Sequence, residues 1–175
     1  MEVWRAYNEG LKGVIVNPGV IIGPVCDNHE ISRIFNMIRK GFRYYTNGQN
    51  GYVDVRDVAD FMVQLANKEE AQRQRYLMIA ENISYRDFFE MIAASFGVKA
   101  PDKEAGKTLQ KTLLVADTVR SMLTGKSSVV TKELIELITS RYDYRSDKII
   151  GELGIAFRPV RQSVEDTCRF MMQNK

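Results

Sequence analysis

The chain has 175 residues, of which 45% are hydrophobic and 27% are charged, a composition typical of a globular protein with a core of useful size. Its net charge of +3 comes from 25 basic and 22 acidic residues spread along the chain, so no dense basic run favours a nucleic-acid partner. No apolar run approaches the roughly 20 residues that a membrane span needs.

The two cysteines and the N-terminal charges indicate the compartment. Cys26 and Cys168 lie far apart and have no Cys-x-x-Cys partner, so we expect free thiols in a reducing environment. Charged residues interrupt any signal-peptide core in the first dozen positions. A cytoplasmic location is therefore predicted.

The single histidine limits the chemistry that the chain can carry out. His29 is the only histidine, which excludes His-based triads and multi-histidine metal sites within this chain. Cys26, Asp27 and His29 would form a cramped metal trio without the spacing of known sites. No metal site is predicted, and a solvated loop residue is the alternative reading of His29.

The first half of the chain alternates between apolar runs and amphipathic patterns. Residues Met1–Gly10 resemble the end of a helix, and Gly13–Asn17 is a continuous apolar run typical of a strand buried on both faces. We expect that strand to break at Asn17-Pro18-Gly19, because proline cannot donate to a ladder. Helical spacing follows over Glu30–Arg39. Short strands are predicted at Phe42–Tyr45 and Tyr52–Val55, joined by a turn-rich segment.

Two helices and one strand are predicted next. Asp57 is a suitable N-cap for a helix whose buried stripe is Val58, Phe61, Met62 and Leu65. Tyr76–Ala80 has the pattern of a strand. Ser84, with Asp87 three residues later, opens a helix that ends at Gly97 and buries Phe88, Phe89, Ile92 and Phe96.

The second half is mostly helical. Recurring apolar faces predict helices over Leu109–Leu123, Thr131–Ser140, Ser146–Leu153 and Val160–Met172. Alternating strands and helices favour an α/β protein with a parallel sheet, and the trailing helices favour a smaller lobe at its edge. We therefore expect a sheet-forming part over residues 1–80 and a mainly helical lobe over residues 81–175.

Two candidate sites follow from these elements. The Asn17-Pro18-Gly19 break lies at the carboxyl end of a predicted parallel strand, where open α/β sheets bind ligands, although a plain strand terminator has the same pattern. Strand alternation places Asp54 and Arg56 on one face, where they face a ligand or simply pair with each other.

Three segments together carry a family resemblance. They are Val14–Pro24 (Val-Ile-Val-Asn-Pro-Gly-Val-Ile-Ile-Gly-Pro), Gly51–Phe61 (Gly-Tyr-Val-Asp-Val-Arg-Asp-Val-Ala-Asp-Phe), and the tail from Tyr144 to Thr167, where Leu153-Gly154 and Pro159 precede a last helix. In this order they resemble the C-terminal half of the extended short-chain dehydrogenase/reductases, a family that includes NAD-dependent epimerases, dehydratases and dihydroflavonol-reductase-like enzymes. The fold implied is the C-terminal part of a Rossmann-like parallel sheet plus a mainly helical substrate-binding lobe.

The resemblance also implies a cofactor and residue roles. It implies NAD or NADP, with Pro18, Gly19 and Val20, and less firmly Asn17, meeting the nicotinamide carboxamide. His29, Asp54 and Arg56 would lie on the substrate side. Asn50 stands where the nucleotide-sugar members often place an arginine that pairs with diphosphate, and this favours a carbonyl reductase over an epimerase.

The family's other motifs are missing from this chain. The sequence contains no Gly-x-x-Gly-x-x-Gly loop and no Tyr-x-x-x-Lys pair ahead of Asn17; Tyr144 and Lys148 have that spacing, but they lie in the tail pattern. No catalytic residue is therefore identified, and we expect both motifs upstream in the parent reading frame. The expected partner is a small carbonyl or sugar substrate, with a homodimer as a further possibility. The alternatives are a nucleotide-sugar epimerase or dehydratase fragment and a non-catalytic binding or assembly domain.

Overall fold

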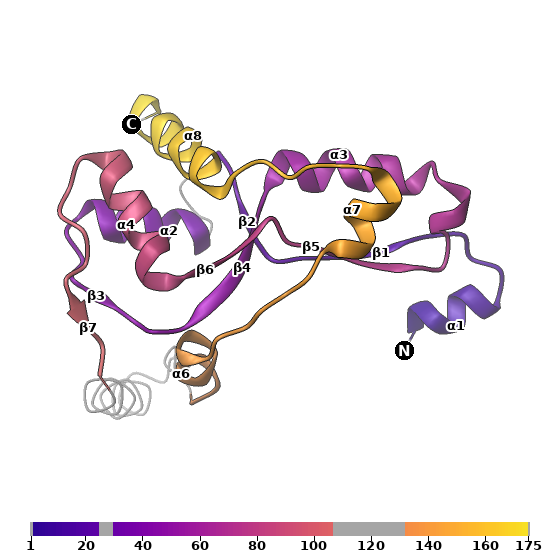
Figure 1. The fold of residues 1–175 in the computed structure, drawn as a ribbon, viewed down its shortest axis with the longest axis horizontal. Coiled ribbons are helices and arrows are strands. Elements are labelled where there is room, and N and C mark those ends of the chain that lie inside the picture. Colours follow the sequence, from indigo (N-terminus) through magenta and orange to yellow (C-terminus); the bar gives the residue numbers. More distant parts are fainter. Residues whose placement is uncertain (1, 25–29, 107–131, 175) are drawn as a thin grey trace, which may run out of the picture. The chain divides into compact units, whose positions relative to one another are not determined.

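The computed structural model describes residues 2–24, 30–106 and 132–174 (Figure 1). The chain forms two compact units that interleave along the sequence. Unit 1 comprises residues 1–25, 51–82 and 143–175, and unit 2 comprises residues 26–50 and 83–142. This division differs from the predicted ranges 1–80 and 81–175, because the last two helices pack against strands of unit 1.

Strands and helices alternate as the sequence predicts for an α/β protein. The elements of unit 1 are listed here together with β4 and β6, whose residues are divided between the two units. They are α1 (Glu2–Asn8), β1 (Ile15–Pro18), β2 (Val20–Ile22), β4 (Gln49–Asp54), α3 (Val55–Ala66), the 3₁₀ helix η1 (Glu69–Ala71), β5 (Arg75–Met78), β6 (Glu81–Ser84), α7 (Asp147–Leu153) and α8 (Val160–Gln173). Unit 2 adds α2 (Glu30–Arg39), β3 (Tyr44–Tyr45), α4 (Tyr85–Phe96), β7 (Lys103–Glu104) and α6 (Lys132–Thr139).

The strand pairs of unit 1 are parallel, and they exchange partners halfway. β1 pairs with β5, whereas β2 pairs with β4 in a sheet of order β2-β4-β6. The exchange takes place at Gly19, whose N–H donates to Met78 O at 3.2 Å, and at Ala80, whose N–H donates to Tyr52 O at 2.8 Å. The segment with β1 and β2 and the segment with β5 and β6 therefore each contribute to two short sheets in succession.

The strand breaks within the predicted Asn17-Pro18-Gly19 segment, although β1 continues through Pro18, one residue beyond its predicted end at Asn17. Ile15 donates to Gln74 O at 2.9 Å and Gly19 donates to Met78 O, so the odd-numbered residues face β5. Since strand residues alternate in direction, Pro18 faces away from β5 and its missing N–H costs the ladder nothing. The break falls at Gly19, the last residue of the predicted segment.

The core of unit 1 lies between the strands and the helices α3 and α7, which run alongside β1 and β5 (Figure 1). Its buried members are Val53, Val58, Phe61, Leu65, Ala71, Tyr76, Met78 and Ile149. Three of the four residues in the predicted stripe of α3 are therefore buried. Met62 is not, since it is 47% exposed, and it is a correction to the prediction.

The N-cap of α3 is Asp54 and not the predicted Asp57. The helix begins at Val55, and the Asp54 side chain accepts a hydrogen bond from Arg56 N at 2.7 Å. Asp57 already lies in the first turn, where it binds Arg158. Both aspartates have the chemistry of a cap, and a partner 101 residues away engages one of them.

Unit 2 is built on the packing of α2 against α4. Phe35 makes edge-to-face contacts with Phe88 and Phe96, at centroid distances of 6.1 and 6.5 Å. As predicted, Ser84 caps α4 by accepting from Asp87 N at 3.1 Å, and Gly97 ends the helix in the left-handed region at φ 67°. Here the local sequence signals and the packing agree.

Other differences from the sequence predictions concern short strands. β2 and β6 are present but were not predicted, and β4 begins at Gln49, inside the predicted turn segment. The predicted helix over Leu109–Leu123 lies outside the described residues. Within the described ranges, no helix combines the length and the apolarity needed to cross a membrane.

Candidate functional site

The junction between β1 and β2 contains the four predicted cofactor residues. Asn17 and Pro18 end β1, Gly19 is the junction itself, and Val20 opens β2. All four are partly exposed. Because Pro18 faces away from β5, its carbonyl is directed to the open side of the strand, where a ligand amide could donate to it.

Close backbone packing fixes the shape of this junction. A Cβ built on Gly19 would lie 2.3 Å from Gly51 O and 2.6 Å from Ile79 Cδ1. Only glycine fits at this position, since real Cβ atoms do not approach other atoms so closely. The junction is therefore a rigid turn of the backbone rather than a flexible loop.

A buried carboxylate lies one strand away. Asp54 has no exposed surface, and its Oδ2 accepts from Ser163 Oγ at 2.6 Å and from Arg56 Nη2 at 2.7 Å. Its Oδ1 accepts from Arg56 Nε at 2.9 Å and from Arg56 N. Burial alone would raise the pKa of Asp54, but the hydrogen bonds from Arg56 and Ser163 outweigh burial and hold the pKa below its ordinary value.

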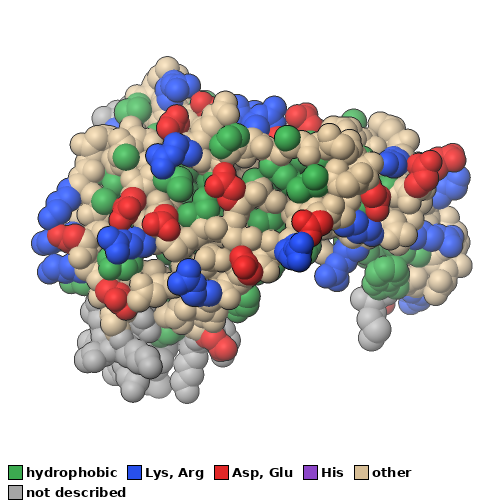
Figure 2. All heavy atoms as spheres, in the orientation of Figure 1, with side chains coloured by type: hydrophobic (Ala, Val, Ile, Leu, Met, Phe, Trp, Pro, Cys, Tyr) green, Lys and Arg blue, Asp and Glu red, His purple; other side chains and the backbone are tan. Residues whose placement is uncertain are grey.

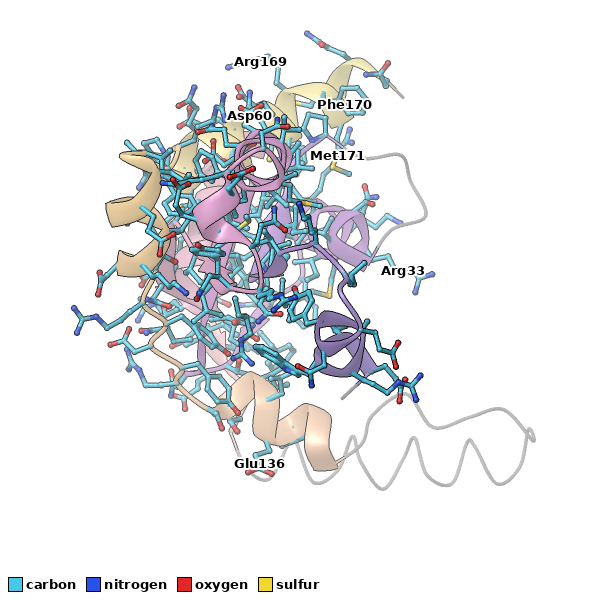
Figure 3. All side chains as sticks on the ribbon, turned by 90° about the vertical axis from the view of Figure 1, so that its right-hand side faces the viewer. Arg33, Asp60, Glu136, Arg169, Phe170 and Met171 are labelled. Carbon is cyan, nitrogen blue, oxygen red and sulfur yellow. The ribbon has the colours of Figure 1, made fainter. Side chains whose placement is uncertain are left out.

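The same arginine links this carboxylate to the last helix. Arg56 Nη2 lies 2.9 Å from Asp166 Oδ2 on α8, and the hydrogen bonds that Arg56 donates to Asp54 and Asp166 raise the pKa of Arg56. Asp166 also pairs with Arg169 at 3.1 Å. Figure 3 shows Arg169 projecting outward from α8, so this series of paired charged side chains leads from the buried Asp54 to the surface.

A second buried aspartate, Asp57, lies three residues after Asp54 and pairs with an arginine. Asp57 has 3% of its side chain exposed, and it accepts from Arg158 N at 2.7 Å and from the Arg158 guanidinium. Asp60, whose side chain projects outward from α3 in Figure 3, lies 3.7 Å from the same guanidinium. Asp54 and Asp57 thus both attach α3 to the C-terminal segment.

These contacts give Asp54 a structural role, whereas the Arg56 side chain is 41% exposed and its substrate-side role stays a prediction. Every carboxylate oxygen of Asp54 is engaged, and none of its surface is exposed to a ligand. The two residues do pair, but the predicted strand geometry was wrong, because Arg56 lies in the first turn of α3. The substrate-side prediction for His29 lies outside the described residues.

A tyrosine with a nearby lysine occurs elsewhere in unit 1. The fully buried Tyr76 donates its hydroxyl hydrogen bond to Glu152, and Lys148 Nζ lies 4.5 Å from its ring centroid. Burial, together with the hydrogen bond to Glu152, raises the pKa of Tyr76. An acid/base tyrosine needs the opposite shift, so Tyr76 does not have the properties of the family's acid/base residue. Lys148 itself donates to Gln74 Oε1 at 2.8 Å.

Metal binding receives no support from the described part of the chain. No group of three or more His, Cys, Asp and Glu side chains in the described ranges is arranged to hold an ion. Cys26, Asp27 and His29, rejected as a metal trio, lie outside those ranges.

Several partners in these networks were not anticipated from the sequence. Ser163, Asp166 and Arg158 complete the two buried carboxylate sites, and Gly51 shapes the β1–β2 junction. The only local signal is that Ser163 and Asp166 lie three residues apart, on one face of a helix. Nothing in the sequence connects them with positions 54 and 56.

Parallel strands, covering helices and a glycine junction at the carboxyl end of β1 define a Rossmann-like α/β fold. Comparisons with individual known proteins support this fold. No protein-family model matches the chain. The chain is 26% identical over 172 residues to cinnamoyl-CoA reductase 1 of Petunia hybrida, a match that covers 97% of this chain and 43% of the petunia protein.

Solved structures give the same answer for the fold. The crystal structure of gox2253 matches with a TM-score of 0.77 and 27% identity, over 98% of this chain and 53% of that one. A nucleoside-diphosphate-sugar epimerase from Pseudomonas aeruginosa matches with a TM-score of 0.71 and 19% identity, over 99% and 52%. Further structures of this fold, at 11 to 17% identity, were solved with NADPH or NAD.

The predicted resemblance to the extended short-chain dehydrogenase/reductases is confirmed by these matches, in sequence by the petunia reductase and in fold by the solved structures. The predicted Rossmann-like fold class is confirmed as well. The chain spans about half the length of the proteins it matches.

Proposed function

We propose that this chain is the C-terminal part of an NAD(P)-dependent dehydrogenase/reductase that transfers hydride between a nicotinamide and a carbon bearing oxygen. The observation that carries the proposal is the likeness of 97% of the chain to part of a named reductase. The exposed junction at the carboxyl end of β1 supports it, because this is the edge at which open α/β sheets bind ligands.

In this proposal the junction holds the cofactor's amide. The Pro18 carbonyl accepts from the carboxamide, and the close packing of Gly19 on Gly51 fixes the course of the backbone beside it. Val20 and Asn17 line the same turn. The bound nicotinamide supplies the hydride chemistry, and the residues of this chain orient it.

The nucleotide-binding loop and the acid/base pair come from elsewhere in the proposed enzyme. The chain has no Gly-x-x-Gly-x-x-Gly loop to hold a pyrophosphate. We therefore expect the chain by itself to bind neither NADH nor NADPH. Calorimetric titration checks this, and micromolar affinity for either cofactor would contradict it.

The proposed substrate is a small ketone or aldehyde rather than a nucleotide sugar. Asn50 stands where a diphosphate-pairing arginine is expected, and its neutral amide, whose Nδ2 lies 3.5 Å from Tyr85 OH, carries no positive charge to pair with diphosphate. The second candidate, a nucleotide-sugar epimerase fragment, is favoured by the likeness to the Pseudomonas epimerase. A non-catalytic binding domain is the third.

The deciding experiment is a chimera in which this chain replaces the matched part of the gox2253 chain. We expect the folded chimera to bind NADPH or NADH and to reduce members of a carbonyl panel. Faster turnover of a UDP- or GDP-sugar would favour the epimerase, and a folded chimera that binds neither cofactor would favour the binding domain.

A further inference from the structure

The outward face of α2 carries two basic side chains that the packing of unit 2 does not use. On the inward face Phe35 and Ile38 are fully buried, and Phe35 contacts α4. Arg33 and Lys40 are exposed, and neither forms a hydrogen bond, ion pair or ring contact with another residue in the described part of the chain. Figure 3 shows Arg33 projecting outward from α2.

The other basic side chains that the structure describes in unit 2 are engaged. Each of them pairs with a carboxylate, donates to an amide oxygen or lies over an aromatic ring. They are Arg39, Arg43, Arg86, Lys99, Lys103 and Arg141. Figure 2 shows basic and acidic side chains mixed over the part of unit 2 that carries α4 and β7. Arg33 and Lys40 are therefore exceptions among the described cations of this unit.

Both exceptions line one hollow of about 570 Å³. Its other lining residues are Asn36, Met37, Gly41 and Phe42. Arg33, Asn36 and Lys40 follow a spacing of three and four residues, which places them on one face of the helix. Seven residues at 1.5 Å each separate Arg33 from Lys40 by about 10.5 Å along the axis, a span that two long side chains can close above Asn36.

The end of α2 gives this hollow an apolar wall. Gly41 has φ 85°, and its N–H donates to Ile38 O at 2.9 Å, while Phe42 N donates to Met37 O at 3.2 Å. These two bonds form a Schellman motif, in which the residue after the glycine packs back against the last turn of the helix. The Phe42 ring also contacts the Tyr44 ring, with centroids 6.0 Å apart. The wall is therefore fixed by the backbone and by a ring contact.

Helix polarity does not account for both charges. The C-terminal end of a helix favours cations in its last turn, where Arg39 lies directly before Lys40. Arg33 lies near the opposite end of α2, where the helix dipole favours anions instead. The charge of Arg33 therefore does not stabilise the helix, and it is available to an anionic ligand.

We propose that this hollow binds a small aromatic phosphate ester. Arg33 has the paired N–H donors that fit phosphate oxygens, Lys40 adds a second positive charge, and the Asn36 amide can donate between them. The aromatic group of the ester rests on Met37 and Phe42, because a ring and a thioether both favour contact with an aromatic ring. All the lining residues belong to unit 2, so the inference is independent of the cofactor junction proposed in unit 1.

The probe that tests this site is phenyl phosphate, titrated into the chain and followed by NMR at the Arg33 Nε–H and Asn36 Nδ2 groups. We expect saturable shifts with a Kd below about 1 mM. Inorganic phosphate and phenol each carry half of the ligand, and each should bind roughly tenfold more weakly. Absence of saturation, or equal affinity for either half and the whole, would overturn the proposal.

Two charge variants test the phosphate contacts. Arg33→Gln and Lys40→Gln should each weaken phenyl phosphate roughly tenfold, because each removes a charged hydrogen-bond donor. Lys99→Gln is the matched control, since it removes one positive charge from the same unit at a side chain that is 76% exposed and does not line the hollow. It should leave the affinity unchanged. Equal weakening by all three variants would indicate diffuse attraction and contradict the inference.

A third variant tests the apolar wall. Phe42→Leu keeps an apolar residue in the Schellman motif but removes the ring. It should weaken phenyl phosphate and leave the weaker binding of inorganic phosphate as it was. Unchanged affinity for phenyl phosphate in this variant would refute the aromatic part of the proposed ligand.

Discussion

Gly19 and Gly51 lie in such close backbone contact that a Cβ on Gly19 would sit 2.3 Å from the carbonyl oxygen of Gly51. A Cβ on Gly51 would in turn lie 2.7 Å from Ile79 Cγ2 and 3.0 Å from Tyr144 Cδ2. The two glycines let the β1–β2 junction pack closely on β4. The proposed cofactor turn thus depends on a packing requirement.

Replacing Gly19 by alanine should therefore destabilise the chain. The added methyl group meets backbone, which cannot move aside, so we expect a loss of about 1–3 kcal/mol in the free energy of unfolding. Urea denaturation measures it. The control is Gly151→Ala in α7, where nothing lies within 4 Å and a gain of up to about 1 kcal/mol is expected from helix propensity. Equal effects at both positions would contradict the packing argument.

Ser163→Ala should cost about 1–3 kcal/mol, because it removes a donor from the buried Asp54 carboxylate. Gln162→Ala, at an exposed neighbouring position of α8, should change stability by no more than about 0.5 kcal/mol. A double-mutant cycle with Asp54→Asn then measures the coupling between positions 54 and 163. A coupling energy near zero would show that the hydrogen bond contributes nothing.

Acid should destabilise the chain partly through Asp54. Its folded pKa lies below its ordinary value, so its stabilising contribution is present above the unfolded pKa of about 4 and is lost as the pH falls through the folded pKa. The variant Asp54→Asn should be less stable at neutral pH and should show a shallower loss of stability below about pH 4. Asp60→Asn, on the same helix and exposed, should keep the wild-type slope. Parallel curves for wild type and Asp54→Asn would disprove the assignment.

Arg158→Met should destabilise unit 1, because the buried Asp57 carboxylate loses its charged partner. Removing one member of a buried pair costs about 3–5 kcal/mol, and we expect about 2 kcal/mol here, since the Arg158 side chain is 36% exposed. Thermal unfolding measures this change. Arg161→Met, on the exposed side of α8, is the control. Adding Asp57→Asn to Arg158→Met should recover part of the loss, and failure to do so would argue against an unpaired charge as the cause.

Much of the fold could be predicted because its signals are local. The helix pattern over Glu30–Arg39 matches α2, and Ser84 and Gly97 mark the ends of α4 because caps are set by the neighbouring backbone. β2 and β6 were missed, since strands of three and four residues depend on partners far along the chain.

The candidate site was likewise predicted where its signals are local and missed where they depend on distant residues. The glycine junction was predicted, but the strand before it was ended one residue too early, because the direction of Pro18 depends on which strand lies beside it. The cap of α3 was assigned to Asp57, since two aspartates three residues apart look equivalent in sequence. Arg158 and Ser163 decide between them, and both come from a segment more than 100 residues later.

The late position of those two partners has a consequence for the order in which the protein can form. During synthesis the segment that carries Asp54 and Asp57 leaves the ribosome long before Arg158, Ser163 and Asp166 exist. Until then both carboxylates remain hydrated, and the start of α3 cannot settle against its neighbours. Unit 1 therefore reaches its final form only after translation has passed residue 166, and a ribosome stalled before that point would expose an unfinished α3.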